Sequence, residues 1–319
     1  MPFTEDNISQ LPALKLLCNL GYQYLSPAEA LAMREGRESN VILTDVLRER
    51  LHHINQIKLG RKTAQFSEAN IERAIQKLKD APLSEGLVQA CNQTYNLLVF
   101  GLALEQSIDG DKKSHTIQYI DWENPENNIF HLTEEFSVMR TGRKDTYRPD
   151  IVLFVNGIPL AVIECKSPTI KEPIKQAISQ HIRNQQENGI QPLYVYSQIL
   201  MALSLTEAKY ATTNTKEEFW AVWKEKDEHY QEAIQELVNR PLASELVDKL
   251  FAHPDIRTIA DRKSFEEKYA LPVAPTAQDI QLYGLAAPER LLQIVKDFIL
   301  FEGGVVKKVA RFQQFFAIN

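Results

Sequence analysis

The chain has 319 residues, 44% hydrophobic and 24% charged, which is typical of a soluble globular protein. At ~150 residues per domain this length predicts about two domains. Three widely spaced cysteines (Cys18, Cys91 and Cys165) argue against a disulfide framework or a zinc site and favour a reducing, cytoplasmic location. The start is polar and no run of ~18 apolar residues occurs, so we expect neither a signal peptide nor a membrane partner. The net charge of −6 argues against tight, free-standing DNA binding.

The first hundred residues have apolar side chains at helical spacing. This pattern predicts helices over residues 8–20, 26–33, 41–57, 67–78 and 84–104. Ser26 is a candidate N-cap for the second of them. We find no internal repeat or low-complexity tract. The N-terminal third is therefore expected to be mainly helical.

A sheet is predicted to begin near residue 116. Strands are expected over 116–122 and 129–139, separated by the polar segment ENPENN with Pro125 as a breaker. After a charged loop comes YRPDIVLFVNGIPLAVIECKSP (147–168), which predicts two apolar strands around a turn at Asn156-Gly157. An amphipathic helix is expected over 174–186, followed by strands over 193–197, 200–205 and 208–213.

From about residue 227 the pattern becomes helical again. Helices are expected over 230–239 and 243–251, a linker over 271–278, and an amphipathic helix over 288–301 before a basic segment at 305–316. No G-x-x-x-x-G-K-[S/T] phosphate-binding loop occurs, so a nucleotide-driven motor is not expected in this chain. We predict one domain over 1–230 and a helical segment over 231–319.

Three charged residues interrupt the apolar segment 147–168. Asp150 heads its first strand, and Glu164 and Lys166 lie near the end of its second. Because side chains alternate on a strand, Glu164 and Lys166 share a face and Cys165 points the other way. Two carboxylates beside an ammonium can hold a hard cation next to a phosphate. A charged strand end that only faces water is the alternative interpretation.

The spacing Glu-x-Lys or Asp-x-Lys is weak evidence by itself. It recurs in this chain, in segments that are polar or helical, at Asp111/Lys113, Asp261/Lys263 and Glu266/Lys268. The context of Glu164 differs, because it ends a long apolar strand that follows a strand headed by Asp150. Charged residues in so apolar a segment need a chemical reason.

Strand register decides whether Asp150 can join this face. A plain two-residue turn at Asn156-Gly157 pairs Asp150 with Ile163 and leaves Asp150 and Glu164 on opposite faces. A metal site therefore requires an odd loop or a bulge in this hairpin.

The simplest solution is a three-residue loop. A turn at Val155-Asn156 followed by a left-handed Gly157 pairs residue 154 with 158 and returns Asp150 to the face of Glu164. Pro159, which cannot donate a ladder hydrogen bond, fits an irregular start of the second strand.

The pattern Pro-Asp, spacer, Glu-x-Lys resembles the PD-(D/E)xK nuclease superfamily. From IDWENPENNIF through ECKSP, and again in QPLYVYSQILMALS and VVKKVARFQQFFAIN, the chain resembles the N-terminal nuclease region of type I restriction enzyme R subunits. This resemblance implies an α/β fold, a mixed sheet flanked by helices, leading into a helicase motor. It implies Mg²⁺-dependent cleavage of double-stranded DNA in a complex with methylation and specificity subunits.

The resemblance also assigns site residues. Asp150 and Glu164 are expected to ligate the metal, together with the backbone carbonyl of Cys165, and Lys166 to orient the attacking water. Gln180 matches the Gln of a Gln-x-x-x-Tyr motif, but Asn184 stands where the family has Tyr. His181 is a possible catalytic base, although a surface histidine is the more ordinary interpretation.

Other expected roles lie outside the hairpin. An acid from the N-terminal helices could assist the site, with Glu68, Glu72 and Glu85 as candidates, although each is more simply a solvent-facing helix acid. Gln314 matches the adenine-reading glutamine of the motor, so ATP is expected only in a longer protein of which this chain is an N-terminal part. A basic excess over 140–183 suits DNA or is a solvated face. The alternative function is a non-catalytic module that docks the motor onto partner subunits.

Overall fold

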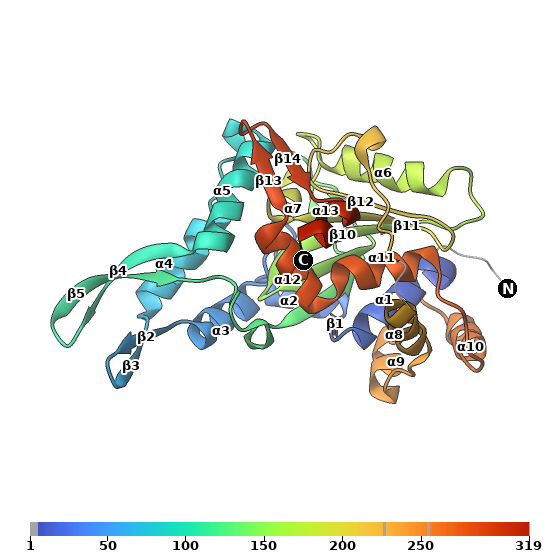
Figure 1. The fold of residues 1–319 in the computed structure, drawn as a ribbon, viewed down its shortest axis with the longest axis horizontal. Helices are drawn as coiled ribbons and strands as arrows, with labels where there is room; N and C mark the ends of the chain where they lie inside the picture. The colour runs from blue at the N-terminus through green and yellow to red at the C-terminus, as the bar shows by residue number, and fades with distance from the viewer. Residues whose placement is uncertain (1–5, 226–227, 254–255, 319) are drawn as a thin grey trace.

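A six-stranded mixed sheet lies at the centre of the fold (Figure 1). The structure, a computed structural model, describes residues 6–225, 228–253 and 256–318. In spatial order the strands are β1 (Gln23–Leu25), β6 (Phe130–Glu134), β9 (Ile151–Val155), β10 (Ile158–Cys165), β11 (Ile199–Leu203) and β12 (Ala208–Ala211). The β1–β6 and β10–β11 pairs are parallel and the other pairs antiparallel.

Helices surround this sheet. The helices α6 (Pro173–Asn184) and α7 (Gln191–Tyr196) both contact β10, and α2 (Pro27–Met33) contacts β1 and β6. The remaining longer helices are α1 (Leu11–Asn19), α3 (Thr44–Ile54), α4 (Glu68–Lys79), α5 (Leu87–Phe100), α8 (Glu228–Asn239), α9 (Ser244–Leu250), α10 (Ile259–Lys268), α11 (Ala277–Ala286), α12 (Pro288–Asp297) and α13 (Phe312–Ile318). Short helical turns are η1 (Asp6–Gln10), η2 (Leu83–Glu85), η3 (Pro125–Asn127) and η4 (Glu217–Phe219).

Four two-stranded hairpins complete the described part of the chain. Two of them, β2–β3 and β4–β5, project from the body on the side of α3 and α4 (Figure 1). The strands are β2 (Gln56–Leu59), β3 (Lys62–Gln65), β4 (Leu102–Ile108), β5 (Asp111–Ile117), β7 (Val138–Met139), β8 (Thr146–Tyr147), β13 (Ile299–Glu302) and β14 (Val306–Val309).

Several predicted boundaries need correction. The predicted helix 84–104 ends at Phe100 because Gly101 has a left-handed φ of 74°, and a strand follows. The predicted strand 116–122 lies mostly beyond the end of β5. The predicted strand 129–139 is interrupted at Glu135, which has φ 47°. The helix predicted over 288–301 ends at Asp297 and continues as β13.

The predicted strand 193–197 is a helix, α7. Its side chains from Leu193 to Tyr196 are all buried, so no polar face marks its period. Pro192 at the start of the helix was the better signal, because a fixed φ and a missing N–H suit the first helical turn. By contrast, the Ser26 cap is confirmed, since its side chain accepts a hydrogen bond from the Glu29 N–H and Glu29 returns one.

The segment after residue 230 packs against the rest of the chain. Ile234 and Leu285 belong to the same buried cluster as the central strands, and Lys15 donates hydrogen bonds to the carbonyls of Val238 and Arg240. The division into domains at residue 230 stays a prediction. Within the described ranges, no helix is long and apolar enough to cross a membrane.

Candidate active site

The turn of the β9–β10 hairpin has two residues. Asn156 and Gly157 both have left-handed φ values, 52° and 82°, and Val155 pairs with Ile158 across them. This is the geometry that Asn-Gly favours between antiparallel strands. The predicted three-residue loop with a turn at Val155-Asn156 is therefore wrong.

The ladder nevertheless contains the irregularity that the site requires. Pro159 pairs with Phe154, but Ala161 pairs with Leu153, so Leu160 is an extra residue in β10. Beyond this bulge the register continues to Ile163 opposite Ile151. The predicted bulge is confirmed, at Leu160 and not at Gly157.

One step past the paired residues, this register sets Asp150 opposite Glu164. Opposed residues share a sheet face, so both carboxylates lie on one face. Lys166 follows two residues after Glu164 and reaches the same place, since its Nζ lies 3.5 Å from Asp150 Oδ2. Without the bulge, Asp150 would oppose Ile163.

Backbone groups hold this cluster in position. Asp150 Oδ2 accepts a hydrogen bond of 2.6 Å from the Cys165 N–H, and Lys166 Nζ donates to the Cys165 carbonyl at 2.7 Å. The Lys166 N–H donates to Leu203 O on β11. All three charged residues of the predicted site are buried.

Burial sets the electrostatics of Glu164. Loss of solvation raises its pKa well above the usual value for a glutamate, and the negative charge of Asp150 raises it further. The positive charge of Lys166 opposes the shift. A bound cation would offset the effect of the Asp150 charge on Glu164.

Two side-chain amides from α6 contact Glu164. Gln180 Nε2 donates to Glu164 Oε2 at 2.5 Å, and Asn184 Nδ2 donates to Oε1 at 3.2 Å. The two residues are four apart and therefore lie on one face of the helix. The residue that departs from the family motif, Asn184, thus contacts the carboxylate directly.

The donor set suits a magnesium ion. Among the residues that the structure describes, no three His, Cys, Asp or Glu side chains are grouped closely enough to hold a metal. The site offers two carboxylates and the carbonyl oxygen of Cys165, which has two lone pairs and accepts from Lys166. Mg²⁺ is commonly held by one or two carboxylates while it keeps several waters.

Sequence reasoning missed polar residues on the neighbouring strand. Glu135 directly follows β6, and its N–H donates to the Asp150 carbonyl at 3.0 Å. Burial and the negative charge of Asp150 both raise the pKa of Glu135. Gln10 Nε2 donates to Glu134 Oε2 and to the Asp150 carbonyl. The available signal was the Glu134-Glu135 pair at the end of an apolar strand.

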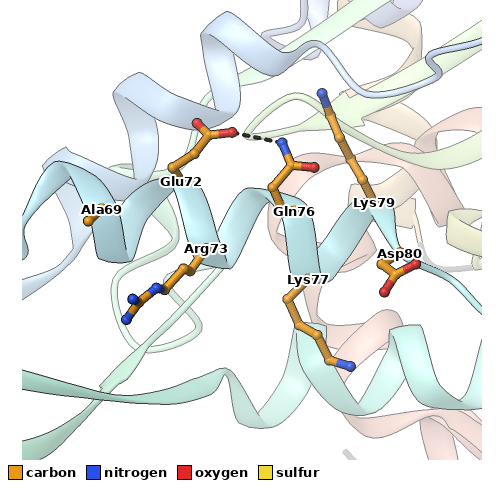
Figure 2. Close-up of a pocket in the computed structure, with 7 residues that line it drawn as sticks. All are labelled: Ala69, Glu72, Arg73, Gln76, Lys77, Lys79 and Asp80. Carbon is orange, nitrogen blue, oxygen red and sulfur yellow. Dashed lines mark hydrogen bonds between the residues drawn. The ribbon is translucent and has the colours of Figure 1, made fainter.

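The candidate helix acids make contacts elsewhere. Glu68 pairs with His52 at 2.9 Å, Glu72 with Arg48 at 2.7 Å, and Glu85 accepts from Gln93. Figure 2 shows Glu72 on α4 beside Gln76, in a surface pocket bordered by Arg73, Lys77, Lys79 and Asp80. The structure brings none of the three acids into the contacts of Glu164.

His181 is neither a surface histidine nor a group open to substrate. Its ring is fully buried, with Nε2 3.0 Å from the Met201 carbonyl oxygen and Nδ1 3.1 Å from the Tyr194 hydroxyl. Burial lowers its pKa to about 4. Its side chain points inward because β11 and α7 cover that face of α6.

Gln314 lies far along the chain from this cluster, on α13. Its Oε1 accepts a hydrogen bond from the Arg311 N–H at the start of the same helix. It borders a groove of about 930 Å³ formed by the β13–β14 hairpin and residues near Tyr210. Its predicted role in binding adenine stays a prediction.

Basic side chains flank the acidic cluster. Exposed residues of this kind in the loop before β9 and the segment before α6 are Arg143, Lys144, Arg148 and Lys171. The guanidinium carbons of Arg140 and Arg183 lie 4.4 and 4.6 Å from the ring centroid of Tyr147. The local charge is therefore positive around a pair of buried carboxylates.

Residues 2–219 match the family described as type I restriction enzyme R protein N terminus. The chain belongs to this family. Its fold is a mixed α/β one, with a six-stranded mixed sheet flanked by helices.

Curated relatives agree with this membership. The chain is 27% identical over 99% of its length to the putative type I restriction enzyme MjaIXP endonuclease subunit of Methanocaldococcus jannaschii. It is 26% identical over 99% of its length to the HindI endonuclease subunit of Haemophilus influenzae. It covers 27% and 26% of those two relatives, about a quarter of their length. It is also 26% identical over 63% of its length to the EcoprrI endonuclease subunit of Escherichia coli, of which it covers 56%.

Proposed function

We propose that this chain is the Mg²⁺-dependent DNA endonuclease part of a type I restriction R subunit, built on a PD-(D/E)xK site. The observation that carries the proposal is the bulge at Leu160, which sets Asp150 opposite Glu164 with Lys166 beside them. Burying three charged groups on one face of so apolar a sheet is unfavourable, so a catalytic or metal-binding role is the best explanation for them. The substrate would be double-stranded DNA, which the surrounding basic side chains suit.

Asp150 and Glu164 would hold the ion, with the Cys165 carbonyl as a further oxygen ligand. When bound, Mg²⁺ supplies Lewis-acid polarisation of the scissile phosphate. Lys166 would orient the attacking water and offset the negative charge that develops on the phosphate. Gln180 would keep Glu164 in place through its hydrogen bond to Oε2.

The remainder of the activity would come from elsewhere in a longer protein. We propose that an ATP-driven motor follows this region, with Gln314 at its adenine site, and that methylation and specificity subunits select the DNA. Base readout is not assigned to this chain.

The test separates cutting from translocation. Lys166→Ala, in the full-length protein assembled with its partner subunits, is expected to lower Mg²⁺-dependent plasmid cleavage by ~10²-fold or more while DNA-stimulated ATP hydrolysis persists. Lys268→Ala removes the lysine of a second Glu-x-Lys, on the exposed face of α10, and is expected to leave both activities unchanged. Loss of both activities in well-folded Lys166→Ala would favour the docking-module function instead.

A further inference from the structure

We propose that Arg183 binds a phosphate of the DNA strand that lies at the metal site. This inference rests on the nuclease function proposed above and adds a substrate-binding residue to it. Arg183 is the penultimate residue of α6 and its side chain is exposed, so a ligand can reach it. The ordinary interpretation of such a residue is a solvated surface arginine. Its fixed position, its remaining donors and its uncompensated charge argue against that interpretation.

The guanidinium of Arg183 is fixed by two neighbours. Its central carbon lies over the ring of Tyr147, 4.6 Å from the ring centroid. Its Nη2 and Nε donate to Asn184 Oδ1 at 3.2 and 3.4 Å. Ordering so long a side chain costs conformational entropy, which a freely moving surface arginine would not lose. The group is therefore held in place before any ligand arrives.

These contacts join Arg183 to the acidic cluster. The same Asn184 amide donates from Nδ2 to Glu164 Oε1 at 3.2 Å. One side chain thus separates the guanidinium from a proposed metal ligand. The electrostatics agree, because burial raises the pKa of Glu164 and the positive charge of Arg183 is one of the effects that oppose this rise.

The outer end of the guanidinium keeps its donors. Asn184 accepts one N–H from Nε and one from Nη2, which leaves the N–H groups of Nη1 and the second N–H of Nη2. These remaining groups form the fork with which an arginine binds two oxygens of one phosphate. Within the described residues, nothing else accepts a hydrogen bond from Arg183.

Arg140 shows the contrast, because it lies over the same Tyr147 ring, 4.4 Å from the centroid, but has other partners. Its Nη1 donates to Asp145 Oδ2 at 2.7 Å, and its Nε donates to the Asn188 carbonyl at 2.9 Å. Asp145 therefore compensates the charge of Arg140. In the described ranges, no carboxylate forms an ion pair with Arg183.

A DNA phosphate is the anion that fits this arrangement. The loop that carries Arg140 also exposes Arg143 and Lys144, so a polyanion would gain from several positive charges where a small anion would gain from one. Binding a phosphate would compensate the charge of Arg183 beside the carboxylates that hold the cation. The geometry therefore suits a DNA strand with one phosphate on Arg183 and the metal next to it.

The experiment uses Arg183→Gln, which removes the charge and keeps a donor for Asn184 Oδ1. In the full-length protein with its partner subunits and ATP, plasmid cleavage at saturating Mg²⁺ is expected to fall by ~10²-fold, while DNA-stimulated ATP hydrolysis persists. Mn²⁺ binding is measured in the nucleotide-free, full-length protein by electron paramagnetic resonance, with Glu164→Ala defining the signal of this site. It should be at least as tight as in the wild type, because removing a positive charge cannot weaken the attraction of a cation.

Arg140→Gln is the matched control. It removes the other cation that lies over the Tyr147 ring, so an effect that comes only from packing on Tyr147 would appear in both variants. Since Asp145 already compensates the charge of Arg140, we expect cleavage and Mn²⁺ affinity to equal those of the wild type.

Three outcomes would refute the phosphate contact and leave the nuclease function standing. They are wild-type cleavage by Arg183→Gln, equal losses of cleavage and Mn²⁺ affinity in Arg183→Gln, and the same loss of cleavage in Arg140→Gln. Equal losses would mean that Arg183 acts through Glu164 or through the fold. No Glu164-dependent Mn²⁺ binding in the wild type would contradict the nuclease function itself.

Discussion

At the scale of single residues, the site places charges where burial opposes them. Glu164 is fully buried beside Asp150, and Lys166 lies 3.5 Å from the Asp150 carboxylate. Such an arrangement is unfavourable in the metal-free protein, because burial and the neighbouring charge of Asp150 both oppose ionisation of Glu164. Binding sites commonly carry this kind of local cost, which the ligand offsets.

Buried histidines give the protein a predictable response to acid. Burial lowers the pKa of His131 and of His181 to about 4, from 6.5. Below pH 6.5 these two histidines become protonated in the unfolded chain, whereas in the folded protein they stay neutral until about pH 4. The free energy of unfolding should therefore fall across this window, by roughly 2 kcal/mol per histidine between pH 7 and pH 5.

Urea denaturation at pH 7 and pH 5 checks this prediction. His131→Gln should lose about half of the histidine-dependent fall, because it removes one of the two histidines. In the described part of the chain His131 Nδ1 has no hydrogen-bond partner, so the substitution breaks no hydrogen bond at that atom. His229→Gln, whose side chain is 94% exposed, should show the full wild-type fall. A His131→Gln protein with the same pH dependence as the wild type would contradict the assignment.

At the scale of elements, the β9–β10 hairpin positions the site. Its turn is buried against α3, where the Leu43 N–H donates to the Gly157 carbonyl at 2.9 Å. The Asn156 side chain is fixed by two hydrogen bonds: it accepts one from the Ile129 N–H and donates one to the Tyr119 carbonyl. The turn thus fixes one end of the hairpin, and the bulge at Leu160 sets the register at the other.

Gly157→Ala should destabilise the protein more than the same change in a free turn. A Cβ at Gly157 would lie 2.5 Å from the Leu43 carbonyl oxygen, and φ is +82°. Gly110 occupies the equivalent position of the β4–β5 turn, at φ +91°, with nothing within 4 Å of its Cβ. We expect about 1 kcal/mol for Gly110→Ala, from strain alone, and roughly 2–3 kcal/mol for Gly157→Ala. Thermal unfolding of both variants measures the difference, and equal losses would contradict it.

Much of the site could be predicted from the sequence because it depends on strand parity. Glu164 and Lys166 share a face on any regular strand, and Asp150 heading the preceding strand limits the register to those with a bulge. The place of the bulge could not be predicted. Asn-Gly forms a two-residue turn by itself, so the turn does not contain the extra residue. The extra residue is Leu160, which follows Pro159, and a proline has no N–H to donate to the ladder.

Two of the errors share a physical cause, which is burial. The segment 193–197 is apolar on every side, so its period could not distinguish helix from strand. His181 was expected at the surface because its helix is amphipathic, but β11 and α7 both contact its ring nitrogens. Tertiary contacts of this kind leave no signal in local sequence.

At the scale of the whole molecule, residues beyond 230 reach the strands of the site. Arg257 is buried and donates to both oxygens of Glu134, at 2.7 and 2.5 Å, and to Asp6. Glu134 also accepts from Gln10, which donates to the Asp150 carbonyl as well. The C-terminal helical segment is therefore joined, through one arginine, to the strand beside Asp150.

The central claim is that Glu164, alone among the Glu-x-Lys pairs of this chain, belongs to a nuclease centre. Its most direct test is Mg²⁺-dependent plasmid cleavage by the full-length protein with its partner subunits and ATP, comparing Glu164→Ala with Glu266→Ala. Glu266 lies on α10, paired with Arg262 at 2.9 Å, and has the same Glu-x-Lys spacing. We expect Glu164→Ala to lose cleavage by ~10³-fold or more and Glu266→Ala to cut like the wild type. A well-folded Glu164→Ala protein that cuts at the wild-type rate would contradict the claim.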